Sequence, residues 1–323
     1  MRKLIRIVGG AVTLLLAAHV PDGVSAQREG SVVAEFIGST PGDALPREFL
    51  GGLAINAECH YIKWQITLLT NLSSGQPATC NLVAQYYVPA RNNTNQSAEG
   101  PKVTSPGTWK LVQGTKSNSA AVIYHLTAEK SQRSLSFVKV GENLLHLLNP
   151  DGSMMIGTGG WSYTLNRAAN SEKPVDASLA VTTPDMSYKI APLATGPTVF
   201  AIFEGRSPCH GISRELKLPQ HPGCTKVKWR VTLYQDPQTS VPTTYKVEGS
   251  LHRRNPREGT WSIVRGAKTD PNAVVYRLGP TPTEAELLLL KADDNILFFL
   301  NHDREPMVGH ADFSYTLNRV AGK

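Results

Sequence analysis

Two cysteines and two histidines lie close together in the second half of the chain. The segment PCHGISRELKLPQHPGC contains Cys209, His210, His221 and Cys224. Two thiolates and two imidazoles are the donors of a tetrahedral zinc site or of a Cu(I) site. The spacing is irregular, since one cysteine directly precedes a histidine, and adjacent residues reach a single ion only with difficulty. The same cluster therefore has two interpretations, a metal site and a disulfide.

A disulfide between Cys209 and Cys224 is the simpler outcome in an exported protein. The bridge would close a 16-residue loop, which stabilises a fold by about 3 kcal/mol through loss of chain entropy in the unfolded state. Joined sulfurs are no longer thiolates, so His210 and His221 would remain as weak, pH-sensitive metal contacts. The sequence thus predicts no cofactor, with copper or zinc as the alternative.

The first residues predict export, which is what makes a disulfide reasonable. Residues 1–26 combine a basic start, an apolar core over about residues 7–18, and the small residues Val24, Ser25 and Ala26. This is the pattern of a secretory signal peptide cleaved near Ala26. The cleavage point has no cysteine for lipidation, and no later apolar run of about 18 residues predicts a membrane anchor. We expect a periplasmic or secreted protein.

The rest of the chain is a duplication. The hexapeptide SYTLNR occurs at residues 162–167 and 314–319, and residues 107–167 align without a gap to residues 259–319, with 25 of 61 positions identical. Upstream, HYIKWQITL matches TKVKWRVTL and FIGSTP matches FEGRSP, while about 13 extra residues near NNTNQSAEGPKVT indicate a loop insertion in the first copy. We predict a first repeat over 27–167, a linker over 168–197 and a second repeat over 198–323.

Hydrophobic residues in each copy recur with a period of two. In YIKWQITL the residues Ile62, Trp64, Ile66 and Leu68 alternate with polar ones, and KVKWRVTL follows the same pattern. Such alternation predicts strands with one face in a core and one in water. About eight short strands per copy, separated by turns, predict an all-β fold of two tandem antiparallel, lipocalin-like β-barrels. SYTLNR would be the closing strand of each barrel, so its repetition indicates a fold and not a catalyst.

The second cysteine pair follows from the alignment. Cys59 aligns with Cys224, but Gly42 occupies the place of Cys209. Cys59 would then need Cys80 as its partner, so the alignment predicts a Cys59–Cys80 disulfide.

Four tryptophans are candidates for a ligand cavity. Trp64 and Trp229 occupy equivalent strands, as do Trp109 and Trp261 in the two GTW segments. Inward-facing core residues are the favoured interpretation, and lining of a cavity for a small apolar ligand is the alternative.

Nothing in the sequence has the pattern of a catalytic centre. The polar residues that both copies share lie in turns or in SYTLNR, and no nucleophile–base pair, phosphate loop or metalloprotease motif is present. We predict a protein that is not an enzyme.

Removal of the signal takes away three basic residues and one acidic residue, so the formal charge falls from +7 to about +5. The densest basic segment, HRRNPRE at residues 252–258, lacks interleaved aromatic residues, which argues against nucleic-acid binding.

An ordered set of short motifs resembles a known family. FEGRSPCHGISREL, GTW, VVYRL, LLLLKADDNILFFLN and DFSYTLNR are similar to the N-terminal domain of the NlpE family, over nearly all of the second repeat and more loosely over the first. These envelope lipoproteins are associated with copper resistance and with surface sensing through an envelope-stress pathway. The resemblance implies a non-enzymatic, lipocalin-like barrel. Gly205, Pro208 and Cys209 match the family's Pro-Cys segment, whereas the second cysteine of its C-x-x-C and the lipid-attachment cysteine are absent.

The sequence thus predicts an exported, non-enzymatic tandem-barrel protein of the NlpE-like class, acting in envelope stress or copper and metal tolerance with an envelope protein as partner. A lipocalin-like carrier of a small apolar ligand is the alternative. An enzyme in a barrel mouth, such as an isomerase or hydrolase, is the third hypothesis, which a convergent carboxylate or histidine pair deep in the cavity would favour.

Overall fold

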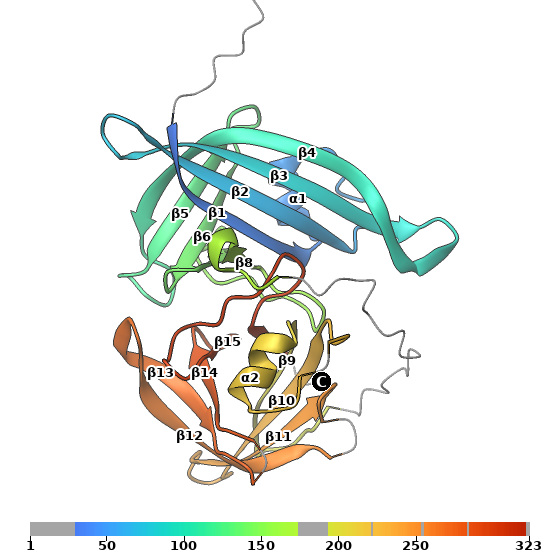
Figure 1. Cartoon of the computed structure of the whole chain (residues 1–323), viewed down its shortest axis with the longest axis vertical. Coiled ribbons are helices and arrows are strands. Elements are labelled where there is room, and N and C mark those ends of the chain that lie inside the picture. The colour runs from blue at the N-terminus through green and yellow to red at the C-terminus, as the bar shows by residue number, and fades with distance from the viewer. Residues whose placement is uncertain (1–29, 174–192, 221, 253–254, 283, 321–323) are drawn as a thin grey trace, which may run out of the picture.

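Two closed, eight-stranded antiparallel barrels follow one another along the chain (Figure 1). The computed structural model describes residues 30–173, 193–220, 222–252, 255–282 and 284–320. The predicted all-β class and the tandem barrels are confirmed. Barrel 1 consists of β1 (Gly30–Pro41), β2 (Tyr61–Asn71), β3 (Pro77–Ala90), β4 (Asn93–Gln113), β5 (Val122–Ala128), β6 (Ser134–Val140), β7 (Leu144–Leu147) and β8 (Thr164–Arg167). Barrel 2 consists of β9 (Val199–Ser207), β10 (Val227–Gln235), β11 (Pro242–Gly249), β12 (Arg257–Ala267), β13 (Asp270–Leu278), β14 (Leu287–Lys291), β15 (Ile296–Leu300) and β16 (Thr316–Arg319).

The period-two pattern places one face of each strand inside a barrel. On β2, Ile62, Trp64, Ile66 and Leu68 are all buried, while Gln65 between them is exposed. These four side chains belong to one apolar cluster of barrel 1, and a corresponding cluster fills barrel 2. The burial of this apolar surface provides the main driving force for each barrel.

Each barrel closes where its first strand meets its last. In barrel 1, Phe36 and Ile37 on β1 pair with Arg167 and Asn166 on β8, and β9 pairs with β16 in the same way. Gly38 permits the close approach, because a Cβ there would lie 2.7 Å from the Leu165 side chain. The end of SYTLNR is therefore the closing strand in both copies, as predicted.

A short helix follows the first strand of each barrel. Helix α1 (Ala44–Leu50) and helix α2 (His210–Glu215) occupy equivalent positions in the two repeats. Phe49 and Leu50 of α1 belong to the core of barrel 1, and Ile212 of α2 belongs to the core of barrel 2. Each helix thus covers apolar side chains of its own barrel.

The extra residues of the first copy were predicted to form a loop, and this prediction is wrong. The extra residues extend the hairpin of β3 and β4, and Figure 1 shows these two strands projecting beyond the body of barrel 1. The pairing of Val88 with Ala98 and of Pro89 with Ser97 continues the ladder into the extension. The polar composition suggested a loop, but the backbone pairing is satisfied as a ribbon.

Several predicted segments fall outside the described residues. The signal peptide over 1–26 does, and so does the linker over 174–192. The linker's start is a 3-10 turn over Ala168–Asn170, after which the backbone N–H of Glu172 donates to the Gly309 carbonyl of barrel 2. Within the described part of the chain, no helix is both long and apolar enough to cross a membrane.

Candidate functional site

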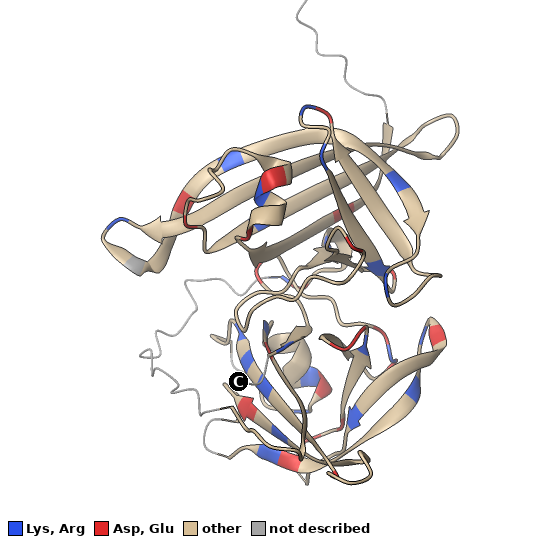
Figure 2. Ribbon diagram, turned by 180° about the vertical axis from the view of Figure 1, so that it is seen from behind, with Lys and Arg blue, Asp and Glu red and all other residues tan. Residues whose placement is uncertain are grey.

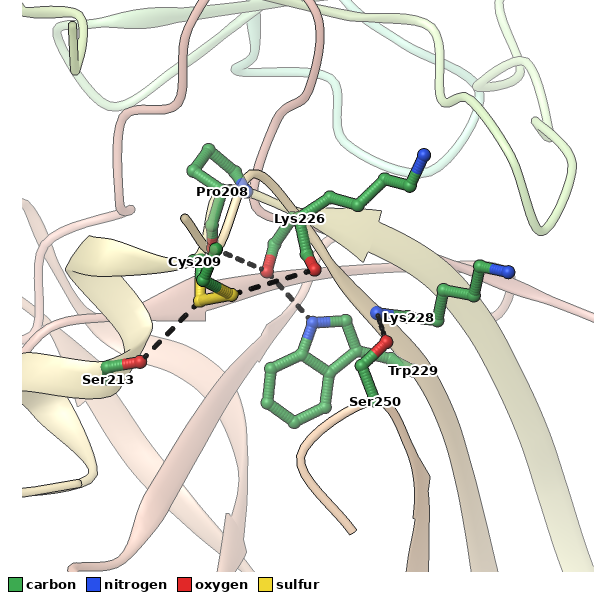
Figure 3. Close-up of a disulfide and its surroundings, with 9 residues drawn as sticks. Pro208, Cys209, Ser213, Lys226, Lys228, Trp229 and Ser250 are labelled. Atoms are coloured by element: carbon green, nitrogen blue, oxygen red, sulfur yellow. Dashed lines mark hydrogen bonds between the residues drawn. A yellow bond between two sulfur atoms is a disulfide. The ribbon is translucent and has the colours of Figure 1, made fainter. Parts of the chain in front are cut away.

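The disulfide predicted between Cys209 and Cys224 is formed. The two Cα atoms are 5.8 Å apart, and the bridge joins the start of α2 to the segment that leads into β10. Figure 3 shows the bridge beside the indole of Trp229, with Ser213 of α2 on its other side. The bridge therefore pins α2 to the wall of barrel 2.

The alternative tetrahedral metal set of Cys209, His210, His221 and Cys224 is not formed, because its two sulfurs are bonded to each other and cannot act as thiolates. His221 lies outside the described residues. No other cluster of three or more histidine, cysteine or acidic side chains with a metal-site arrangement occurs among the residues that the structure describes.

The predicted Cys59–Cys80 disulfide is wrong, since neither cysteine is bonded to another sulfur. Cys59 lies just before β2, whereas Cys80 on β3 pairs with Leu68 near the far end of β2. At about 3.3 Å per residue, roughly 25 Å of strand separates them. The equivalence of Cys59 with Cys224 nevertheless holds in space, because a Cβ on Gly42 would lie 2.5 Å from the Cys59 sulfur. Burial raises the pKa of the Cys59 thiol.

The four tryptophans proposed for a ligand cavity belong to the two packed cores. Trp64 and Trp229 donate their indole N–H to the hydroxyls of Thr40 and Ser207 at 2.9 Å. The same kind of contact serves the GTW segments, where Trp109 donates to the Leu69 carbonyl and Trp261 to that of Tyr234, at 2.7 and 2.6 Å. Each copy thus satisfies its indoles with equivalent partners, as expected of structural core residues.

The repeated hexapeptide has a second role that sequence reasoning missed: it holds the two barrels together. The hydroxyls of Ser162 and Ser314, which are the same residue in the two copies, lie 2.7 Å apart. Thr316 donates to its own counterpart Thr164 at 3.0 Å. A residue that contacts its own equivalent lies beside a two-fold axis, so the two barrels form an isologous contact within one chain.

The asparagines of the hexapeptide complete this pseudo-symmetric interface. Asn166 donates from its amide to the His310 carbonyl at 3.0 Å and accepts from the Gly309 N–H at 2.7 Å. Asn318 makes the equivalent two hydrogen bonds from barrel 2 to barrel 1. Its amide donates to the Thr158 carbonyl at 3.4 Å and accepts from the Gly157 N–H at 2.8 Å. Both asparagines are buried. Each amide therefore satisfies two backbone groups of the opposite barrel.

His146 lies at the same interface and breaks its symmetry. Its counterpart in barrel 2 is Phe298, and the two rings meet edge to face with centroids 5.9 Å apart. The His146 Nε2 lies 2.9 Å from the Met155 carbonyl, which can only accept, so Nε2 carries the proton and Nδ1 accepts from Thr164. Burial lowers the pKa of His146 to about 4. The imidazole is thus neutral and part of a hydrogen-bonded chain.

A buried charged network in barrel 2 also escaped the sequence analysis. Arg257 donates to the Tyr245 hydroxyl and to the Glu284 carboxylate, both at 2.9 Å. His252 lies near the other carboxylate oxygen, with its Nδ1 3.6 Å from Glu284, and its buried Nε2 has no partner in the described structure. Burial lowers the pKa of His252, while Glu284 opposes that shift. The network has no counterpart in barrel 1, where Ser105 and Gln132 align with Arg257 and Glu284, so no repeated motif signalled it.

The fold and site define a class: a tandem pair of closed barrels with packed cores, one of them bridged by a disulfide at its helix. Comparisons with protein-family models, with curated proteins and with solved structures found no match.

Proposed function

We propose that this chain is an exported, non-enzymatic protein of the NlpE-like kind that acts in envelope stress or copper tolerance through its outer surface. The observation that carries the proposal is the Cys209–Cys224 disulfide, because a disulfide is typical of an exported protein and Cys209 lies in the segment that resembles the family's Pro-Cys motif. The proposed partner is an envelope protein.

The absence of catalysis belongs to the same proposal. His252 and Glu284 are a buried histidine and a carboxylate that lie near one another, the elements of a general base. Their 3.6 Å separation is longer than a hydrogen bond, and the carboxylate is already held by Arg257. We assign this network to the stability of barrel 2.

The alternative of a lipocalin-like carrier is less well supported. The inward side chains of both barrels, including the four tryptophans, are packed against one another in the cores. A carrier needs a lumen that accepts its ligand. Native mass spectrometry of the purified, exported chain is the test, and a co-purified apolar molecule of fixed mass would support the carrier over the surface-acting protein.

The stress role is tested in a Gram-negative host that carries a transcriptional reporter for an envelope-stress pathway. We expect production of the exported chain to raise reporter activity several-fold or to increase survival on copper. The matched control is the same chain without residues 1–26, which is not exported and should have neither effect. If the exported chain changes neither the reporter nor copper survival, the proposal is wrong.

A further inference from the structure

The interface between the two barrels, here called the seam, has two halves that are related by the pseudo-two-fold axis. In the first half, the positive and negative side chains that meet are equal in number. Ser39 on β1 donates to the Ala311 carbonyl at 2.8 Å. Lys63, its register neighbour on β2, forms an ion pair with Asp312 at 2.6 Å. A strand pair of barrel 1 thus meets a loop of barrel 2 with one cation and one anion.

The second half has the same backbone arrangement and different charges. Arg206 and Lys228 are register neighbours on β9 and β10, and they occupy the places of Ser39 and Lys63. The loop opposite now belongs to barrel 1, and Gly160 stands where the first half has Asp312. The second half therefore has two cations where the first half has a balanced pair.

Within the part of the chain that the structure describes, no acidic side chain forms an ion pair with either cation. Arg206 stacks over the ring of Trp161, with its guanidinium carbon 5.4 Å from the centroid, and its Nε is buried without a hydrogen-bond partner. Neither Arg206 nor Lys228 forms an ion pair with any residue that the structure describes. Glu204 is nearby, but Arg230 holds its carboxylate at 2.6 Å. Burial of an unpaired guanidinium is costly, and a bound anion would offset that cost.

A hollow of about 180 Å³ lies at these cations. It is lined by Gly159, Glu204, Gly205, Arg206, Lys228, Trp229, Arg230 and Gly249. Figure 2 shows basic residues in blue on several strands of barrel 2, with acidic residues in red among them. At roughly 30 Å³ per water molecule, the hollow has room for a phosphate group together with the first atoms of its carrier.

We propose that this half of the seam, defined by Arg206, Lys228 and Gly160, is a binding site for the phosphate group of a small molecule or lipid headgroup. Two uncompensated cations match the charge of about −2 on a phosphate monoester near neutral pH. The planar guanidinium of Arg206 suits bidentate contact with phosphate oxygens, and Lys228 adds a point charge. The pseudo-symmetry explains the site's origin, because the same place in the first half is filled by the protein's own anion, Asp312.

The test uses the mature full chain and inorganic phosphate at low ionic strength, followed by calorimetry and by tryptophan fluorescence, since Trp161 lies under Arg206. Two variants remove the site in opposite ways. R206S installs the residue of the first half, and G160D restores the missing acid; a Cβ at Gly160 would lie 3.7 Å from the Arg206 guanidinium. The matched controls are G160N, which adds similar bulk without charge, and K102S, which removes an exposed cation of barrel 1.

We expect saturable one-to-one binding by the wild type and by both controls, and at least ten-fold weaker binding by R206S and G160D. Phosphate should also raise the Tm of the wild type but not that of G160D, which reports binding even if R206S folds poorly. Vesicles of phosphatidylcholine with or without phosphatidic acid distinguish the source: binding that requires phosphatidic acid and is lost in G160D assigns a lipid headgroup, and binding of free phosphate alone assigns a soluble phosphate compound. If the wild type binds neither phosphate nor these vesicles, or if R206S and G160D bind as tightly as the wild type, the proposal is wrong.

Discussion

Barrel 1 and barrel 2 hold the helix after their first strand by different means. In barrel 1, buried Arg47 on α1 donates to the backbone carbonyls of Asp43, Ala54 and Ala57. In barrel 2, the Cys209–Cys224 disulfide ties α2 in place. The helix can thus be held against its barrel without a disulfide. The disulfide is a feature of the second copy and not a requirement of the fold.

The same comparison applies to the contact between the barrels. The hexapeptide is identical in the two copies and makes equivalent hydrogen bonds from each side. The residues around it have diverged, with His146 opposite Phe298 and Arg206 in the place of Ser39. The two copies are identical where a side chain must form a hydrogen bond with a buried group of the other barrel. They differ at the positions around that contact.

The largest effect is expected from removing both interface asparagines. N166A with N318A leaves two buried N–H groups and two carbonyls without partners, which we expect to lower the free energy of unfolding by about 4 kcal/mol. Denaturant titration should then show two transitions where the wild type shows one. N166A alone and N318A alone should lower the free energy of unfolding by similar amounts, because their contacts are related by the pseudo-symmetry. A difference of more than about 2 kcal/mol between the two variants would argue against equivalent contacts.

Removing the bridge should act on barrel 2 alone. C209S with C224S is expected to lower the stability of barrel 2 by about 3 kcal/mol, because the unfolded chain regains the entropy of the closed loop. Denaturant unfolding followed by near-ultraviolet circular dichroism measures this loss. A reductant should reproduce it in the wild type and have no further effect on the double variant. Equal destabilisation of a chain in which only Cys59 and Cys80 are replaced would contradict the assignment.

His146, whose counterpart in barrel 2 is Phe298, should make the stability of the interface fall in acid. The unfolded chain protonates His146 near pH 6.5, but the folded chain does so only near pH 4, so the stability it contributes is complete above pH 6.5 and falls as the pH drops toward 4. Between pH 7.5 and 5.0 the wild type should lose about 2 kcal/mol more than H146F, in which both copies carry phenylalanine. The other buried histidines are common to both chains and cancel in the difference. Parallel stability–pH curves for the two proteins would rule this out.

The smallest effect concerns the balanced half of the seam. Lys63 and Asp312 are each about one-third exposed, so K63M should cost only about 0.5 kcal/mol. The counterpart variant K228M removes a cation whose register neighbour is Arg206 and which forms no ion pair with the residues that the structure describes. It should be neutral or slightly stabilising. Thermal unfolding at low salt compares the two, and a larger loss from K228M than from K63M would contradict the assigned charge pattern.

The period of two and the long repeat were sufficient to predict the barrels, because a half-buried strand needs alternation and a duplicated domain needs the same core twice. The predicted export favoured a Cys209–Cys224 disulfide over a metal site, and the disulfide is formed. The Cys59–Cys80 pairing failed because an even cysteine count says nothing about which end of a strand a thiol occupies. The role of Asn166 and Asn318 could not be predicted either, because a polar residue on a closing strand has the same pattern whether it faces water or another barrel.

The central claim is that the repeated hexapeptide joins the two barrels by the same contacts from both sides. Hydrogen exchange at the amides of Gly157 and Gly309 tests it most directly, since these N–H groups donate to Asn318 and Asn166 across the interface. The account predicts strong and similar protection of both amides in the full chain, and loss of both in the chain with N166A and N318A. Rapid exchange of either amide in the wild-type chain would contradict it.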